Sequence, residues 1–176
     1  DTRVKYSKNQ IRSVSTLFWN NFNQRISLLL EHENEDFKQQ GPINDYGIYG
    51  IFDPNQQRTR KTDSASIEYR TKLDQGSIFA VSSRYDKNSQ FKNGTTARAE
   101  LILPLSKSLK FRGSYGTAIK NPTFTERFGY YTNFIGNPDL QPEYSKNLEL
   151  GFDFDLENYN SLFSATLFKS RLVDEI

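Results

Sequence analysis

Apolar and polar residues alternate with a period of two along much of the chain. The clearest stretch is 144–156, in which Leu148, Leu150, Phe152, Phe154 and Leu156 share one face and glutamate, glycine and aspartate residues share the other. This alternation is typical of a β-strand with one apolar and one polar side. Because carboxylates stand opposite a long apolar stripe, we predict that one side of this strand meets an apolar medium and the other meets water.

The same pattern predicts eight strands separated by turns or loops. They cover residues 10–20, 25–36, 64–73, 78–86, 97–103, 109–118, 144–156 and 163–171. Residues 1–9 are predicted to end a loop, and 37–63, which has no periodic apolar face, is predicted to be one long irregular segment. All six prolines fall outside the predicted strands, as expected for a residue that cannot donate to a β-ladder. From the N-terminus, the seven connections are predicted to be short, long, short, medium, short, long and short.

The composition favours a thin apolar stripe over a filled core. Only 35% of the 176 residues are hydrophobic and the mean hydropathy is −0.74, yet 14% are aromatic. The net charge of +2 is too small to indicate a nucleic-acid partner, and the lack of cysteine excludes a disulfide framework and a thiolate metal site. No apolar run approaches the length of a transmembrane helix, whereas the strands of a transmembrane barrel give a much weaker signal. The chain has no methionine and begins Asp-Thr-Arg, so we expect an internal part of a longer polypeptide.

Short turns at one rim and long loops at the other predict an outer-membrane β-barrel. A strand of about ten residues rises roughly 33 Å, which is enough to cross the apolar band of such a membrane when tilted. Aromatic residues are expected to form girdles at the two membrane interfaces. One girdle is predicted near the short turns, from Phe18, Tyr69, Phe79, Phe111, Phe154 and Phe163, and one near the loops, from Tyr85, Tyr115 and Tyr144. The predicted fold class is all-β, an antiparallel transmembrane β-barrel segment.

Two motifs near the C-terminus resemble a known family. Residues 115–124 read Tyr-Gly-Thr-Ala-Ile-Lys-Asn-Pro-Thr-Phe, and residues 136–151 read Gly-Asn-Pro-Asp-Leu-Gln-Pro-Glu-Tyr-Ser-Lys-Asn-Leu-Glu-Leu-Gly. Together with segments 84–91 and 167–171, they resemble the C-terminal barrel half of TonB-dependent outer-membrane receptors, closest to the vitamin B12 (cobalamin) branch. The resemblance covers roughly the last hundred residues well and the earlier part loosely.

The resemblance implies a 22-stranded barrel in the outer membrane of a Gram-negative bacterium, with short periplasmic turns, long extracellular loops and a plugged lumen. It implies import of cobalamin or a similar metal chelate with energy supplied by TonB through an N-terminal plug domain. Residues 1–176 would form a partial barrel domain without the plug and the terminal strands. Such a piece is expected to be an open, curved sheet with two edges, in contact with outer-membrane lipid and lipopolysaccharide.

Candidate ligand-binding residues lie in the segments predicted as rim loops. The set comprises Tyr46, Tyr49, Phe52, Arg58, Phe124, Arg127, Phe128, Tyr130, Tyr131 and Phe134. The rings could stack on a large flat ligand or simply pack the loops together. The arginines, with neighbouring Arg60 and Lys61, could attract an anionic ligand, hold lipopolysaccharide phosphates or form a solvated charged surface.

Charged residues on the polar face of the strands are predicted to line the lumen and to pair with the plug. They are Arg98, Glu100, Arg112, Glu149 and Asp153. The single histidine, His32, and the absence of cysteine argue against a zinc site or a nucleophile relay, so we predict no enzyme activity, no cofactor and no metal site. Alternative hypotheses are a siderophore or haem receptor of the same family, a small closed eight-stranded barrel with a structural role, a membrane-barrel hydrolase and a soluble β-sandwich.

Overall fold

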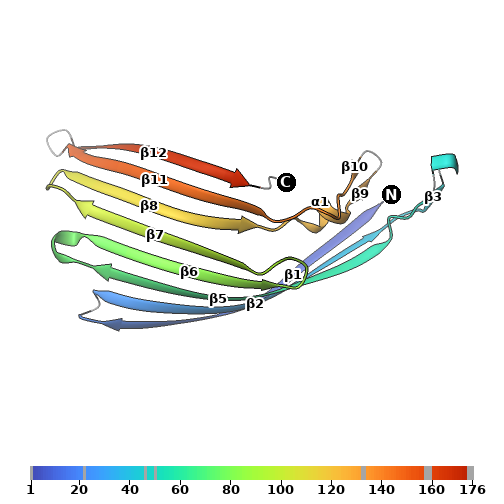
Figure 1. The fold of residues 1–176 in the computed structure, drawn as a ribbon, viewed down its shortest axis with the longest axis horizontal. Helices are drawn as coiled ribbons and strands as arrows, with labels where there is room; N and C mark the ends of the chain where they lie inside the picture. The colour runs from blue at the N-terminus through green and yellow to red at the C-terminus, as the bar shows by residue number, and fades with distance from the viewer. Residues whose placement is uncertain are drawn as a thin grey trace.

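The main body of the molecule is one antiparallel sheet of eight strands (Figure 1). The computed structural model describes residues 2–21, 23–45, 47–49, 51–131, 134–156 and 160–173. The strands follow one another across the sheet in chain order. They are β1 (Arg3–Trp19), β2 (Gln24–Gln40), β5 (Gln56–Lys72), β6 (Ile78–Asn88), β7 (Gly94–Pro104), β8 (Leu109–Lys120), β11 (Glu143–Leu156) and β12 (Ser161–Val173).

Short connections lie at one end of the sheet and long loops at the other (Figure 1). One short connection contains the 3₁₀ turn η2 (Asp74–Gly76), in which Gln75 has a φ of 61°. The first long loop carries β3 (Asn44–Asp45), η1 (Gly47–Tyr49) and β4 (Ile51–Phe52). The last long loop, residues 121–142, carries α1 (Phe124–Phe128), β9 (Tyr130–Tyr131) and β10 (Phe134–Ile135). The two predicted long loops are confirmed, whereas the predicted medium connection is reduced to residues 89–93 and is no longer than the connection 73–77 at the other end.

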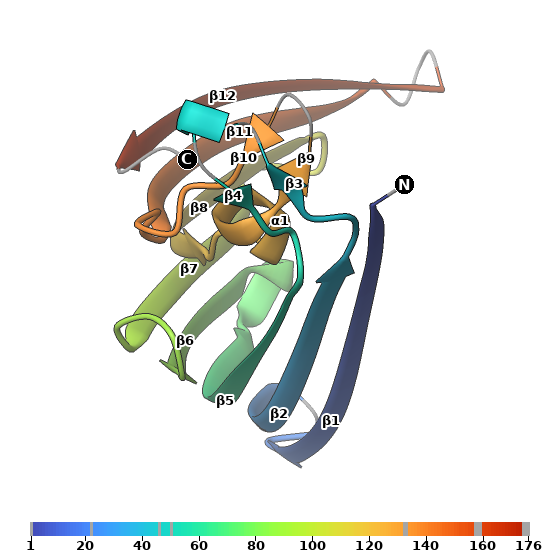
Figure 2. The same ribbon diagram turned by 90° about the vertical axis from the view of Figure 1, so that its right-hand side faces the viewer.

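The sheet is strongly curved, and α1 lies within its curve (Figure 2). The strand order begins with β1 and ends with β12, which do not pair with each other in the described residues. The sheet is therefore an open barrel segment with two edges, and the hypothesis of a small closed eight-stranded barrel is wrong. No helix in the described part of the chain is long and apolar enough to cross a membrane.

The two faces of the sheet differ in chemistry. The convex face carries the predicted apolar stripe, with Ile11, Leu30 and Leu167 exposed to 75%, 64% and 77%. The concave face, which is the side of α1, carries most of the charged residues. Apart from prolines, the only buried apolar side chains among the described residues are Phe37, Ala80 and Phe124, so there is no globular core. An apolar convex face and a charged concave face are the arrangement of a transmembrane β-barrel wall, in which the convex face contacts lipid.

Aromatic contacts on the convex face confirm part of the predicted short-turn girdle. Trp19 stacks on Tyr69 with 6.1 Å between ring centroids, and Phe154 lies 6.2 Å from Phe163. Phe18 is an exception, because its register partner is Arg25, whose ion pair with Glu68 lies on the concave face. The prediction for Phe18 was therefore wrong, and its neighbour Trp19 takes that place.

Most strands are somewhat longer than the pattern predicted, and three of them extend far into segments that were predicted to be loops. β1 begins at Arg3, within the predicted loop 1–9, while β2 continues to Gln40 and β5 starts at Gln56, within the predicted irregular segment 37–63. The loop between them shrinks to 41–55. Beyond the apolar belt both faces of a strand are wet, so the alternation that reveals a strand disappears there.

Candidate ligand site at the loop end

The last long loop folds back onto the concave face of β2 and β5. α1 begins with a capping box, in which the Thr123 hydroxyl accepts from the Glu126 amide at 3.1 Å and the Glu126 carboxylate accepts from the Thr123 amide at 2.7 Å. The amide bond to the carboxylate lowers the pKa of Glu126. The first residue of α1, Phe124, packs against the concave face of the sheet. Its ring stacks on that of Phe37 with 5.5 Å between the centroids and 12° between the planes, and Phe124 is only 3% exposed.

Arg60 of β5 connects the loop to three strands. Its Nε donates to Glu35 Oε2 of β2 at 2.5 Å, and its Nη1 donates to the carbonyl of Pro122 at 2.7 Å. Tyr6 of β1 donates to the other oxygen of Glu35 at 2.7 Å. The guanidinium also lies over the Phe124 ring, 5.0 Å from its centroid. The carboxylate and carbonyl together satisfy a cation that is almost fully buried, as a buried charge requires.

A second pair of arginines surrounds Phe128. Arg58 lies 4.9 Å and Arg127 lies 4.7 Å from the ring centroid of Phe128. Arg127 donates to the carbonyl of Pro138 at 2.6 Å and to the side-chain oxygen of Gln90 at 3.0 Å, and it lies 4.9 Å from the Phe91 ring. Within the described residues, neither Arg58 nor Arg127 forms an ion pair. Burial, together with the nearby cations Arg60 and Arg58, lowers the pKa of Arg127.

A cavity of about 420 Å³ opens between α1 and the wall. Its lining combines the buried ion pair with apolar and hydroxyl groups, namely Tyr6, Glu35, Phe37, Arg60, Thr123, Phe124 and Thr125. Phe128, with Arg58 and Arg127 around it, lies at the C-terminal end of α1, outside this cavity. The site as a whole offers stacked rings and guanidinium groups in excess of carboxylates, which is the chemistry that binds anions and flat ligands.

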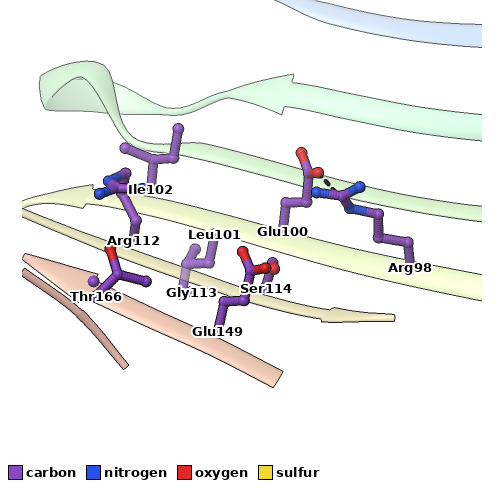
Figure 3. A pocket seen from close by; sticks show the side chains of 10 residues that line it. Arg98, Glu100, Leu101, Ile102, Arg112, Gly113, Ser114, Glu149 and Thr166 are labelled. Atoms are coloured by element: carbon purple, nitrogen blue, oxygen red, sulfur yellow. Dashed lines mark ion pairs between the residues drawn. The ribbon is translucent and has the colours of Figure 1, made fainter. Parts of the chain in front are cut away.

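Four of the five predicted lumen residues, Arg98, Glu100, Arg112 and Glu149, lie around one hollow on the concave face, further from the loops (Figure 3). Arg98 and Glu100 form an ion pair at 2.6 Å, and Arg112 pairs with Asp153 at 2.8 Å. Arg98, Glu100, Arg112 and Glu149 line a hollow of about 150 Å³, and Asp153 lies outside it. The first pair lies within β7 and the second joins β8 to β11. Both pairs are partly exposed, so each contributes little to stability. Together they form a charged surface on the concave face, with a hollow that another protein surface could occupy.

The structure brings together only part of the predicted ligand set. Phe124, Phe128, Arg58 and Arg127 converge, although Arg58 lies on strand β5 and not in a loop as predicted. Tyr46 lies outside the described residues. For five others the structure describes only the backbone: Tyr49, Phe52, Tyr130, Tyr131 and Phe134.

Sequence reasoning missed several contributors to the site, among them Tyr6, Glu35, Phe37 and Phe91. Tyr6 and Phe37 are directly opposite each other in the β1–β2 register. The signal that could have found Phe37 is a lone large apolar residue within a polar stretch, which needs a partner from elsewhere in the chain to be buried.

Comparison with known proteins agrees with this architecture. The family model described as TonB dependent receptor-like, beta-barrel matches residues 2–176, so the chain belongs to this family. Its open sheet is a segment of the family's transmembrane barrel, and the family is one of receptors and transporters.

Solved structures of similar fold include receptors and a transporter. The siderophore receptor PirA from Acinetobacter baumannii aligns with a TM-score of 0.76 and 20% identity over 99% of this chain and 28% of that one. The ferric enterobactin receptor PfeA from Pseudomonas aeruginosa aligns with a TM-score of 0.77 and 16% identity, over 96% of this chain and 27% of that one. The copper transporter OprC aligns with a TM-score of 0.68 and 13% identity, over 88% of this chain and 28% of that one. The chain therefore spans less than a third of the length of these proteins.

Proposed function

We propose that this chain is part of an outer-membrane receptor that imports an anionic metal chelate of the siderophore class, using energy supplied by TonB. The observation that carries the proposal is the pair of guanidinium groups of Arg58 and Arg127 around Phe128, with no carboxylate paired to either in the described residues. A ferric catecholate complex is flat-sided, aromatic and negatively charged. Such a ligand would neutralise both cations, and its own rings could stack on the guanidinium planes.

The location follows from the family and from the apolar belt on the convex face. We place the short turns in the periplasm and the long loops outside a Gram-negative cell, because short periplasmic and long extracellular connections are the rule in such barrels. The wall charges Arg98, Glu100, Arg112, Glu149 and Asp153 are then positioned to face an N-terminal plug domain, which also contacts TonB. The outer membrane supplies lipid and lipopolysaccharide as surroundings.

Cobalamin is the second candidate ligand. It is favoured by the motifs at 115–124 and 136–151, which resemble the cobalamin branch of the family. The similar solved structures include siderophore receptors and a copper transporter. Cyanocobalamin carries no net negative charge, so it would leave the two arginines without a counter-ion. Haem, whose propionates are anionic, remains a third ligand of the same class.

A titration of the full-length receptor in detergent discriminates these ligands. Ferric enterobactin, a ferric hydroxamate, haemin and cyanocobalamin would each be added while protein fluorescence is followed. The proposal predicts saturable binding of an anionic ferric chelate and affinity that falls with rising salt, because the contact is electrostatic. Saturable binding of cyanocobalamin alone, insensitive to salt, would assign the receptor to the cobalamin branch instead.

A further inference from the structure

The connection between β6 and β7 is held in place by hydrogen bonds of its own. Asn88, at the end of β6, accepts through its Oδ1 from the amides of Gln90 at 2.8 Å and Phe91 at 3.1 Å. The Ser89 amide donates to the carbonyl of Lys61 in β5 at 3.0 Å, and the Lys61 amide donates to the Ser89 hydroxyl at 2.9 Å. The connection is therefore tied to β5 and holds the side chain of its second residue, Gln90, in a fixed place.

The carboxamide of Gln90 joins this connection to the candidate ligand site. Its Nε2 donates to the carbonyl of Thr59 at 2.7 Å, and its Oε1 accepts from Nη1 of Arg127 at 3.0 Å. Thr59 lies between Arg58 and Arg60 in β5. The carbonyl needs a donor and the guanidinium needs an acceptor, and a carboxamide offers both. One side chain thus positions Arg127 relative to the two arginines of β5.

The partners of Arg127 in the described part of the chain are uncharged. Besides Gln90, its guanidinium donates to the carbonyl of Pro138, and it lies over the rings of Phe91 and Phe128. These groups orient the guanidinium but supply no negative charge. The positive charge of Arg127 therefore stays available to a ligand.

The neighbouring arginine shows the alternative arrangement. The Arg60 guanidinium also lies near the Phe91 ring, 5.8 Å from its centroid, but its charge is neutralised within the wall by Glu35. A glutamate at position 90 would have nearly the same size as Gln90 and would pair with Arg127 in the same way. The chemical identity of residue 90 thus decides whether Arg127 is paired within the protein or open to an anion.

We propose that Gln90 is a specificity-determining residue of this receptor, whose neutral carboxamide positions Arg127 and leaves its charge free for an anionic chelate. The inference rests on the proposed function. Gln90 acts through Arg127 and is a positioning residue, so the ligand need not touch it. The proposal assigns a role in ligand selection to the short β6–β7 connection, which carries none of the predicted ligand residues.

The test measures binding to the full-length receptor in detergent, with ferric enterobactin and haemin as anionic probes, at low and at high salt. The test variant is Gln90→Glu. The control variant is Gln57→Glu, which makes the same chemical change at an exposed residue of β5. Gln57 is next to Arg58 in the sequence, so its side chain is on the opposite face of the sheet. Arg127→Gln and the double variant Gln90→Glu/Arg127→Gln complete a mutant cycle.

The proposal predicts that Gln90→Glu raises the Kd of the anionic probe by at least about tenfold at low salt, because one charge-assisted contact is lost. Its affinity should also depend less on salt than that of the wild type, since the contact carries less charge. A loop that is merely distorted would keep the salt dependence of the wild type. The control should bind as the wild type does. In the Arg127→Gln background, most of the effect of Gln90→Glu should disappear.

Two results would overturn the inference while leaving the proposed function in place. One is a Gln90→Glu variant that binds the anion as tightly as the control. The other is an effect of Gln90→Glu that is equally large in the Arg127→Gln background, because the new carboxylate would then repel the ligand directly. A wild type that binds neither anionic probe would overturn the proposed function, and the inference with it.

Discussion

Arg60 and Glu35 form a buried ion pair at the loop end, with Nε and Oε2 2.5 Å apart and each side chain 8% exposed. The pair joins β5 to β2, and the same guanidinium holds the carbonyl of Pro122 at the start of the last loop. A single side chain therefore positions α1 and both rings of the Phe37–Phe124 stack. The loop is part of the wall of the lumen and not an independent flap.

Removing one partner of this pair should release the loop. Arg60→Leu leaves the Glu35 carboxylate buried without its cation, and breaking a buried pair in this way costs about 3–5 kcal/mol. We expect hydrogen exchange in residues 121–128 to speed up strongly in the full-length receptor. The double variant Arg60→Leu/Glu35→Leu is the matched control, because removing both charges should cost less. Equal exchange in the single variant and the wild type would show that the pair does not hold the loop.

The capping box of α1 should give the loop a dependence on pH. The Thr123 amide lowers the pKa of Glu126, so its stabilising contribution is complete above the unfolded-state pKa of about 4.3. The contribution is lost as pH falls through the lower folded-state pKa. Glu126→Ala should cost about 1 kcal/mol of local stability at pH 7.

The measurement for the capping box is the exchange of the α1 amides in wild type and Glu126→Ala, at pH 7 and at pH 3.5, each corrected for the intrinsic rate. The difference between the two proteins should shrink at the lower pH. A difference that grows on acidification would contradict the assigned direction of the pKa shift.

Gly136, directly after β10, allows the returning chain to lie against the C-terminal end of α1. A Cβ there would be 2.6 Å from the backbone carbon of Arg127 and from the backbone nitrogen of Phe128. We expect Gly136→Ala to displace α1 and to weaken ligand affinity in a titration. Gly116→Ala is the control, because its Cβ would have no neighbour closer than 3.4 Å. Wild-type affinity for both variants would mean that the position of α1 is unimportant for binding.

The sequence predicts the sheet well where the membrane constrains it and poorly beyond. Residues 144–156 alternate because one face meets lipid, and β11 spans 143–156. Around Phe37 the residues on both faces of the strand are polar, so the alternation that predicts a strand is missing there. Nevertheless, β2 continues to Gln40. Backbone pairing with β1 and β5 maintains the strand there, and pairing across such distances is invisible to a local pattern.

The site shows the same limit. Arg58 and Arg127 are 69 residues apart by number (127 − 58), and only the folded loop brings both to Phe128. The loop rings were recognisable as a group of aromatic residues near Asn-Pro turns. Glu35 and Tyr6 were not, because a single carboxylate or tyrosine within a polar stretch carries no signal until its buried partner, Arg60, is known.

The central claim is that Arg58 and Arg127 bind an anionic metal chelate, and the most direct test is the affinity of the full-length double variant Arg58→Gln/Arg127→Gln for ferric enterobactin. We expect its Kd to rise by about a hundredfold or more relative to wild type, since each of the two charge-assisted contacts is worth about 1.5–3 kcal/mol. The Lys107→Gln variant removes a cation from the short connection between β7 and β8, at the opposite end of the sheet, and should bind as wild type does. Unchanged affinity of the double variant for ferric enterobactin, with tight wild-type binding, would contradict the claim.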